Sequence, residues 1–180
     1  MLGVVSLLDE ANSTFVRELS QGLASEFGIA GIDADASPHV SFHVAESYEI
    51  DDVEKRLRSL ARSVPPVETR TAGAGIFFGE EHVLYLTVVR NPRLTVLQRT
   101  VYDEVRHHAT GEHLSYHPFE WVPHITLGRW PAGQDVTGDV MRYLAGRADT
   151  LRRELALDNL SVIEERGETR RVVTRHDLAA

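Results

Sequence analysis

Two short stretches of the chain carry residue types that can do acid–base chemistry. Pro38-His39-Val40-Ser41-Phe42 and Pro123-His124-Ile125-Thr126-Leu127 both read proline, histidine, a β-branched aliphatic residue, a hydroxyl residue and a large apolar residue. Side chains two positions apart on a strand project from the same face. If both stretches are strands, each one presents an imidazole and a hydroxyl on one side and apolar side chains on the other.

Two such strands facing each other would place two imidazoles and two hydroxyls around one cavity. Histidine moves protons well near neutral pH, so His39 and His124 are the candidate general acid and base. Ser41 and Thr126 can each donate a hydrogen bond to a phosphate oxygen. This set fits metal-free attack on a phosphodiester, in which one histidine deprotonates water and the other protonates the leaving oxygen. We therefore expect neither a cofactor nor a metal.

Neighbouring side chains are weaker candidates for the same cavity. His43 shares a face with His39 under strict alternation, although a packing role is the commoner outcome. The same rule points Arg129 away from the cavity, so the predicted site omits it. Tyr85, Phe119 and Trp121 could stack on a base, but aromatic side chains more often pack in a core.

A histidine-rich stretch invites a metal interpretation, which the spacing does not support. His107 and His108 are adjacent, and adjacent side chains on a helix point about 100° apart. His113 and His117 have helical ligand spacing but stand in a segment that we do not expect to be helical. No carboxylate completes a recognised ligand pattern, so we predict a loop near the cavity and no metal site.

Composition limits the partners. The chain has no cysteine, which excludes disulfides and thiolate chemistry. A net charge of −8 disfavours binding to a long nucleic acid duplex, whereas a small nucleotide or an RNA end needs only a local cationic pocket. The apolar run at residues 2–8 is too short to span a membrane and lacks the form of a signal peptide. We expect a cytoplasmic monomer without a membrane partner.

Hydrophobic periodicity predicts the elements that position the two motifs. Strands are predicted at residues 3–8, 39–48, 67–72, 75–78, 82–89, 121–129, 160–165 and 170–176. Helices are predicted at residues 12–27, 52–64 and 92–108, and a further helix of about 20 residues begins at Thr137. Asp51 and Glu54 fit a capping pattern for the second helix, and residues 109–120 are expected to be irregular.

This order of elements predicts one α+β domain over residues 1–180, with two mainly antiparallel sheets facing a central cleft and helices outside. Each motif strand is followed by a helix, which indicates a duplicated unit. One copy of the motif would then come from each half of the domain.

The motifs resemble the paired histidine signatures of the 2H phosphoesterase superfamily, and within it the 2′-5′ RNA ligase-like branch. The likeness rests on His39-Val40-Ser41-Phe42, on residues 123–129 and on the order of elements. It implies a bilobal, pseudo-twofold fold and metal-independent chemistry on 2′,3′-cyclic phosphates or 2′-5′ linkages. His39 and His124 inherit the acid and base roles, in an order left open, and Ser41 and Thr126 the phosphate-binding role. Ser41 replaces the threonine of many members and keeps the hydroxyl.

Three functions remain in view. The leading hypothesis is a hydrolase, a cyclic nucleotide or RNA phosphodiesterase. The second is a module that holds a nucleotide or RNA end in the same cavity without turnover. The third is an RNA 2′-5′ ligase, which the acidic composition disfavours because ligation requires both RNA ends to be held.

Overall fold

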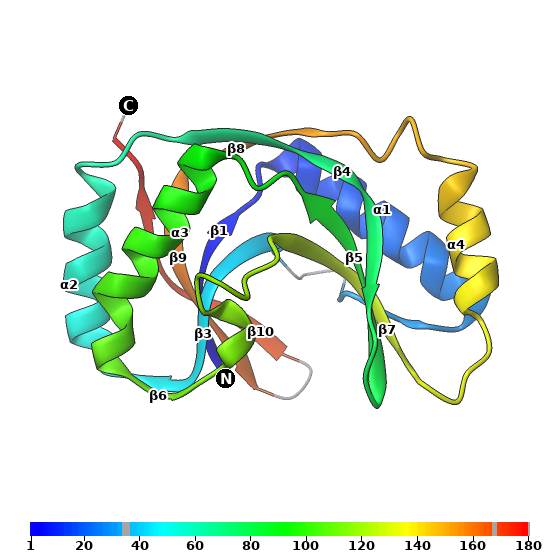
Figure 1. Ribbon diagram of the computed structural model, residues 1–180, viewed down its shortest axis with the longest axis horizontal. Helices are drawn as coiled ribbons and strands as arrows, with labels where there is room; N and C mark the ends of the chain where they lie inside the picture. The colour runs from blue at the N-terminus through cyan, green and yellow to red at the C-terminus, as the bar shows by residue number, and fades with distance from the viewer. Residues whose placement is uncertain (34–36, 167–168, 180) are drawn as a thin grey trace.

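The chain forms an α+β fold of two lobes, each built on a five-stranded antiparallel sheet, with the helices on the outside (Figure 1). The computed structural model describes residues 1–33, 37–166 and 169–179. The predicted pair of antiparallel sheets is confirmed. None of the helices in these described residues is long and apolar enough to cross a membrane.

The first lobe contains the first motif. Its sheet has the order β10-β9-β1-β3-β6. The strands are β1 (Leu2–Leu7), β3 (His39–Tyr48), β6 (Ala109–Glu112), β9 (Asn159–Arg166) and β10 (Thr169–Asp177). Helices α2 (Ile50–Ala61) and α3 (Pro92–Val105) pack against this sheet, and short 3₁₀ turns η1 (Arg106–His108) and η2 (Leu114–Tyr116) flank β6.

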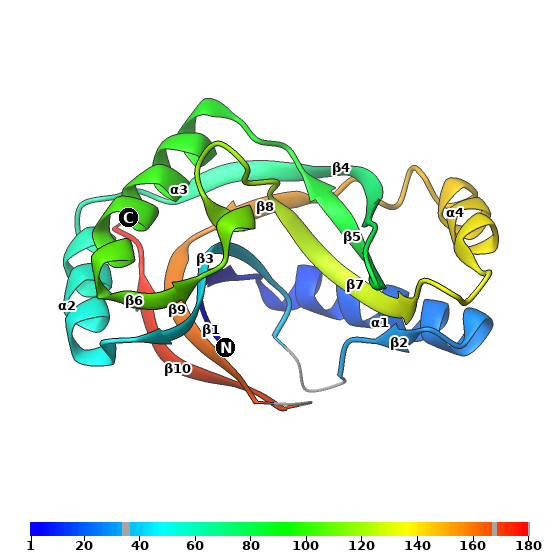
Figure 2. The same cartoon turned by 60° about the horizontal axis from the view of Figure 1, so that its bottom comes forward.

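The second lobe contains the second motif. Its sheet has the order β2-β7-β5-β4-β8. The strands are β2 (Ala30–Gly31), β4 (Val67–Phe77), β5 (Glu81–Val88), β7 (His124–Pro131) and β8 (Glu154–Leu157). Helix α1 (Glu10–Phe27) packs against β7 and β2, and α4 (Thr137–Ala145) contacts α1 (Figure 2).

The helices that follow β1 and β5 exchange lobes. Helix α1 follows β1 of the first lobe but packs behind β7 of the second, and α3 follows β5 of the second lobe but packs behind β3 of the first. Asp9 and Asn91 are the N-cap residues of these helices, since each side chain accepts a hydrogen bond from the backbone N–H three residues later. Each motif strand is therefore supported by a helix from the other half of the chain.

The apolar residues of both motifs lie in one shared hydrophobic core. Val40 and Phe42 of β3 and Ile125 and Leu127 of β7 are all buried in it. The histidines and hydroxyl residues between them are only partly buried. The alternation predicted for the two motifs is therefore present as far as the hydroxyl residue of each strand.

Beyond the hydroxyl residue, each motif strand contains a bulge. Val5 pairs with Ser41 but Val4 pairs with His43, which leaves Phe42 as the extra residue of β3. In β7 the extra residue is Leu127, because Tyr85 pairs with Thr126 and Leu84 with Gly128. A bulge shifts the alternation of every residue after it by one position.

The crossed helices provide a partner for each bulge carbonyl. Gln98 of α3 donates from Nε2 to the carbonyl of Phe42 at 3.1 Å, and Ser20 of α1 donates from Oγ to the carbonyl of Leu127 at 2.6 Å. Both side chains are fully buried. Because buried carbonyls need a hydrogen-bond donor, the two helices stabilise the bulges of the strands that they cover.

Two predicted elements differ because of glycines. Residues 67–77 form one strand, not two, since Gly73 adopts a φ of 114° where the register shifts between Thr71 and Ala74. The helix predicted at about 20 residues ends at Ala145 with Gly146 as its cap. Leu155, which a helix of that length would include, belongs to β8 instead.

Smaller differences concern boundaries. Helix α2 begins at Ile50 after Glu49 without a side-chain cap, so the capping pattern predicted from Asp51 and Glu54 is wrong. The segment expected to be irregular at 109–120 contains β6 and η2. The strands predicted at residues 160–165 and 170–176 are present as β9 and β10 and pair antiparallel, and the hairpin turn expected between them at residues 166–168 falls largely outside the described residues.

Replacing Ser20 by alanine tests the support of the second bulge. Its hydroxyl donates to the Leu127 carbonyl and accepts from the Ile32 N–H at 2.8 Å, so the change leaves two backbone groups without this partner. We expect Ser20→Ala to lower the free energy of unfolding by about 1–3 kcal/mol, measured by urea denaturation. Thr14→Ala, on the exposed side of the same helix, is the control. Equal midpoints for Ser20→Ala and the control would contradict this role.

Candidate active site

A cleft of about 470 Å³ lies between the two sheets and contains all four predicted site residues. His39 and Ser41 line it from β3, and His124 and Thr126 line it from β7. The structure thus brings together residues that are far apart in the sequence. The volume is in the range of pockets that hold small molecules the size of a nucleotide.

The two histidines are held in the same way. His39 Nδ1 lies 2.8 Å from the carbonyl oxygen of Ser37, and His124 Nδ1 lies 2.7 Å from the carbonyl oxygen of Val122. Because a carbonyl only accepts, Nδ1 is the protonated nitrogen of each ring. When the ring is neutral, Nε2 is therefore the nitrogen that can accept a proton. A general base requires this neutral form.

The proline before each histidine helps to set this geometry. Pro38 and Pro123 are both buried, and their carbonyls accept hydrogen bonds at 3.0 Å from the N–H groups of Leu8, directly after β1, and of Val88, the last residue of β5. Proline also has a fixed φ. The start of each motif strand is therefore fixed to its neighbour, with the carbonyl two residues before the histidine turned toward the ring.

Two aromatic rings pack against His124. Its ring centroid lies 4.9 Å from that of Phe77 and 5.4 Å from that of Tyr85, and these two rings stack on each other at 4.1 Å. Burial lowers the pKa of His124, and the hydrogen bond to Val122 opposes this shift only in part. The structure places Tyr85 against His124, where it desolvates the imidazole.

Arg129 lines the cleft, contrary to the sequence prediction. The bulge at Leu127 shifts the alternation, so the side chain five positions after His124 returns to the concave face. Its guanidinium lies 3.8 Å from the carboxylate of Glu81. The glycine at position 128 is the signal that could have indicated the bulge.

His43 lies on the opposite face from His39, because the bulge at Phe42 precedes it. It is fully buried, with Nδ1 2.6 Å from the Tyr48 hydroxyl and Nε2 2.8 Å from the Glu112 carboxylate. Burial lowers the pKa of His43, and Glu112 partly offsets that shift. Its contacts join β3 to β6, which is a packing role.

Of the remaining aromatic candidates, Trp121 is buried and Phe119 is not. The Trp121 indole N–H donates to the Ser41 carbonyl at 2.8 Å, and its ring packs against Phe42. Trp121 therefore ties the segment before β7 to the first motif strand. Phe119 is 83% exposed and does not line the cleft.

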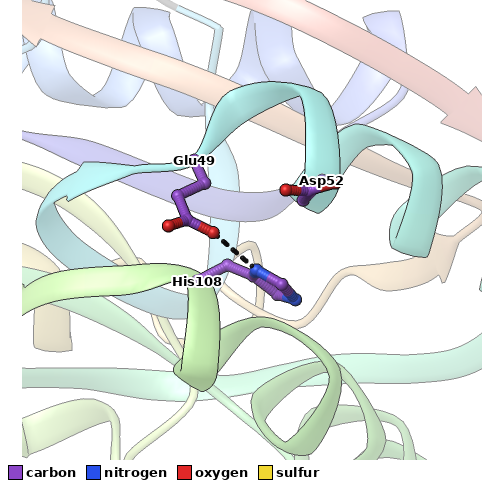
Figure 3. Close-up of side chains that lie close together, drawn as sticks. All are labelled: Glu49, Asp52 and His108. Carbon is purple, nitrogen blue, oxygen red and sulfur yellow. Dashed lines mark hydrogen bonds and ion pairs between the residues drawn. The ribbon is translucent and has the colours of Figure 1, made fainter.

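The histidines of residues 107–117 do not gather at one point. His113 lines the cleft, whereas the ring of His117 packs against those of Tyr102 and Phe119. His108 instead joins Glu49 and Asp52, a grouping without a local sequence signal because the three residues come from the start of α2 and from η1 (Figure 3).

This grouping is a cluster of hydrogen-bonded polar side chains. Donor atoms of the three residues lie within 4.8 Å of one another, and in the part of the chain that the structure describes it is the one such group. His108 Nδ1 lies 2.9 Å from a Glu49 oxygen, and Lys55 donates to Asp52 at 3.2 Å. Lys55 already pairs with Asp52, and none of the three residues lines the cleft, so we assign the cluster to holding η1 against the start of α2.

Solved structures share this fold over nearly their whole length. TT0787 of Thermus thermophilus matches with a TM-score of 0.60 and 16% identity, covering 98% of this chain and 97% of that one. E. coli LigT complexed with NADP⁺ matches with a TM-score of 0.58 and 17% identity, covering 99% and 97%. Usb1 of Kluyveromyces marxianus matches with a TM-score of 0.51 and 12% identity, covering 98% and 96%. At these identities the likeness is one of fold.

A comparison with curated proteins finds no match. The family model described as the 2′-5′ RNA ligase superfamily matches residues 8–169, a span that includes both histidine motifs. Since this span covers most of the sequence, the chain belongs to the 2′-5′ RNA ligase superfamily of 2H phosphoesterases.

Proposed function

We propose that the protein is a metal-independent phosphodiesterase that acts on 2′,3′-cyclic phosphates or 2′-5′-linked nucleotide phosphodiesters. Membership of the superfamily supports phosphodiesterase-type activity in general. The observation that carries the finer proposal is the matched pair of histidines, each with Nδ1 bound to the carbonyl two residues before it and both lining one cleft.

In the proposed reaction the phosphate lies between the two motif strands. One neutral imidazole takes a proton from water at Nε2, and the water oxygen forms a bond to phosphorus. The bond from phosphorus to the 2′ or 3′ oxygen breaks, and the other histidine, which is protonated, gives that oxygen its proton. Ser41 and Thr126 donate hydrogen bonds to non-bridging oxygens, and Arg129 stabilises the charge that develops there.

We assign the role of base in hydrolysis to His124. The aromatic rings of Phe77 and Tyr85 desolvate its imidazole, and this burial keeps its pKa low. A histidine with a lowered pKa is neutral at physiological pH, which is the form that accepts a proton. His39 is then the acid, and the two roles exchange in the reverse direction.

A small nucleotide fits the cleft as the minimal ligand. E. coli LigT has been solved in complex with 3′-AMP, with ATP and with NADP⁺. Opening a 2′,3′-cyclic adenosine phosphate at its 2′ oxygen yields 3′-AMP. We propose that the cleft of this chain binds the same class of molecule, a small nucleotide.

Removing either histidine tests the mechanism. We expect His39→Ala and His124→Ala each to lower kcat/KM on 2′,3′-cyclic nucleotides by about 10²- to 10⁴-fold, with EDTA present throughout. His107→Ala, an exposed histidine outside the cleft, serves as the control. Full activity in either site variant would refute the mechanism, and tight binding without turnover by the wild type would favour the binding module.

The pH profile tests the assignment of His124. Activity requires the neutral imidazole, so kcat/KM should fall as the pH drops through the lowered pKa of His124. Phe77→Ala admits water to the ring, which should raise that pKa and move the acidic limb of the profile to higher pH. Phe78→Ala changes the adjacent exposed residue and should leave the limb in place. An acidic limb that does not move in Phe77→Ala would contradict the assignment.

Arg129→Ala tests the charge that the bulge brings into the cleft. A charge-assisted hydrogen bond contributes about 1.5–3 kcal/mol, so we expect inhibition by inorganic phosphate to weaken by roughly ten- to a hundredfold. Arg142→Ala removes an exposed arginine from α4 and is the matched control. Unchanged inhibition of Arg129→Ala by phosphate would place the guanidinium outside the phosphate site.

A further inference from the structure

Residues 113–122, here called the wall segment, line two separate hollows. Five of them line the cleft, namely His113, Ser115, Tyr116, Glu120 and Val122. The three residues between Tyr116 and Glu120 line a second hollow of about 210 Å³ instead. The wall segment therefore borders both the cleft that holds the two histidines and a neighbouring depression at α3.

The second hollow is locally basic in an acidic protein. Arg90, Arg99 and Arg106 line it, with Asp103 as the one acidic residue among its lining side chains. The chain as a whole has a net charge of −8. The side chain of Arg99 is 71% exposed, and Asp103 lies 3.9 Å from it and 3.8 Å from Arg106, longer than a hydrogen bond. Both guanidinium groups can therefore contact an anion from solvent.

An exposed aromatic ring stands beside these arginines. Phe119 is 83% exposed, and its ring contacts that of His117 at 5.4 Å. The backbone on both sides of it is held, because Arg90 donates to the carbonyls of Pro118 and Trp121. A large apolar ring on a fixed backbone, left in water, is the kind of feature that marks a binding surface.

We propose that the second hollow and Phe119 bind single-stranded RNA that continues from a terminal nucleotide seated in the cleft. This inference rests on the proposed function and extends it. A 2′,3′-cyclic phosphate occupies the 3′ end of an RNA, so the rest of the strand leaves the cleft through the 5′ oxygen of the last nucleotide. Phe119 stacks on an upstream base, and Arg99 and Arg106 contact the phosphates beside it.

The charge pattern of the second hollow favours single-stranded RNA over a duplex. Base stacking on Phe119 requires an unpaired base, and the guanidinium groups of the hollow neutralise only a few phosphates. A duplex would extend beyond them onto an acidic protein. This surface should therefore bind the 3′ end of an oligoribonucleotide more tightly than the mononucleotide that carries the same phosphate.

Fluorescence anisotropy with a 5′-labelled hexaribonucleotide that ends in a 3′-phosphate measures this surface directly. We expect the wild type to bind the hexamer more tightly than 3′-AMP, which is measured by displacement of the labelled hexamer. Phe119→Ala should weaken hexamer binding by about tenfold. Arg99→Ala/Arg106→Ala should also weaken it and reduce the slope of log affinity against log salt by about 0.7 for each phosphate that the variant no longer neutralises. Affinity for 3′-AMP should stay the same in these variants.

The controls are Phe78→Ala, which removes an exposed ring from the turn between β4 and β5, and Arg142→Ala on α4. Equal affinity of the wild type for the hexamer and 3′-AMP would overturn the proposal, and so would unchanged hexamer binding by Phe119→Ala. Because the readout is binding, it is independent of turnover. Failure to hydrolyse any cyclic phosphate would defeat the proposed function alone, whereas hydrolysis with no preference for the hexamer would defeat this surface alone.

Discussion

The hydrogen bonds from Gln98 to the Phe42 carbonyl and from Ser20 to the Leu127 carbonyl support the geometry on which the cleft depends. Each bond stabilises a bulge directly after the hydroxyl residue of a motif strand. Up to the bulge, alternation keeps histidine and hydroxyl on the concave face and aliphatic residues in the core. Both donors come from helices that crossed from the other half of the chain, so the packing that joins the lobes also shapes the motif strands.

The two halves share this framework but differ in the chemistry placed on it. Arg129 occupies the position that Val44 occupies in the first lobe, so cationic charge enters the cleft from one side. At Gly128, a Cβ would lie 2.8 Å from the Ala30 carbonyl oxygen, and this close approach admits β2 beside the bulge. The rings of Phe77 and Tyr85 pack against His124. Departures from symmetry of this kind allow two similar imidazoles to take different protonation states at one pH.

The sequence predicted the features that repeat locally and missed those set by distant contacts. Strand β3 has the predicted bounds, His39–Tyr48, because its apolar residues alternate and Pro38 precedes it. Strict alternation misplaced Arg129, since the bulge depends on Ser20, more than a hundred residues away. The spacing of Leu144, Leu151 and Leu155 suits one face of a long helix, although these leucines reach the core from different parts of the chain. The pairing of Glu49 with His108 likewise depends on a tertiary contact that no local pattern encodes.

Net charge and local charge act at different distances in this molecule. The overall charge of −8 repels an approaching polyanion, but at physiological salt the repulsion is screened beyond about 8 Å. Within that distance the arginines of the cleft and of the neighbouring hollow determine the potential that a phosphate meets. Nucleotides beyond the reach of those arginines add little to the binding affinity. Under the proposed function, this distribution favours binding of the end of a strand, where a 2′,3′-cyclic phosphate is found, over binding of the middle of a strand.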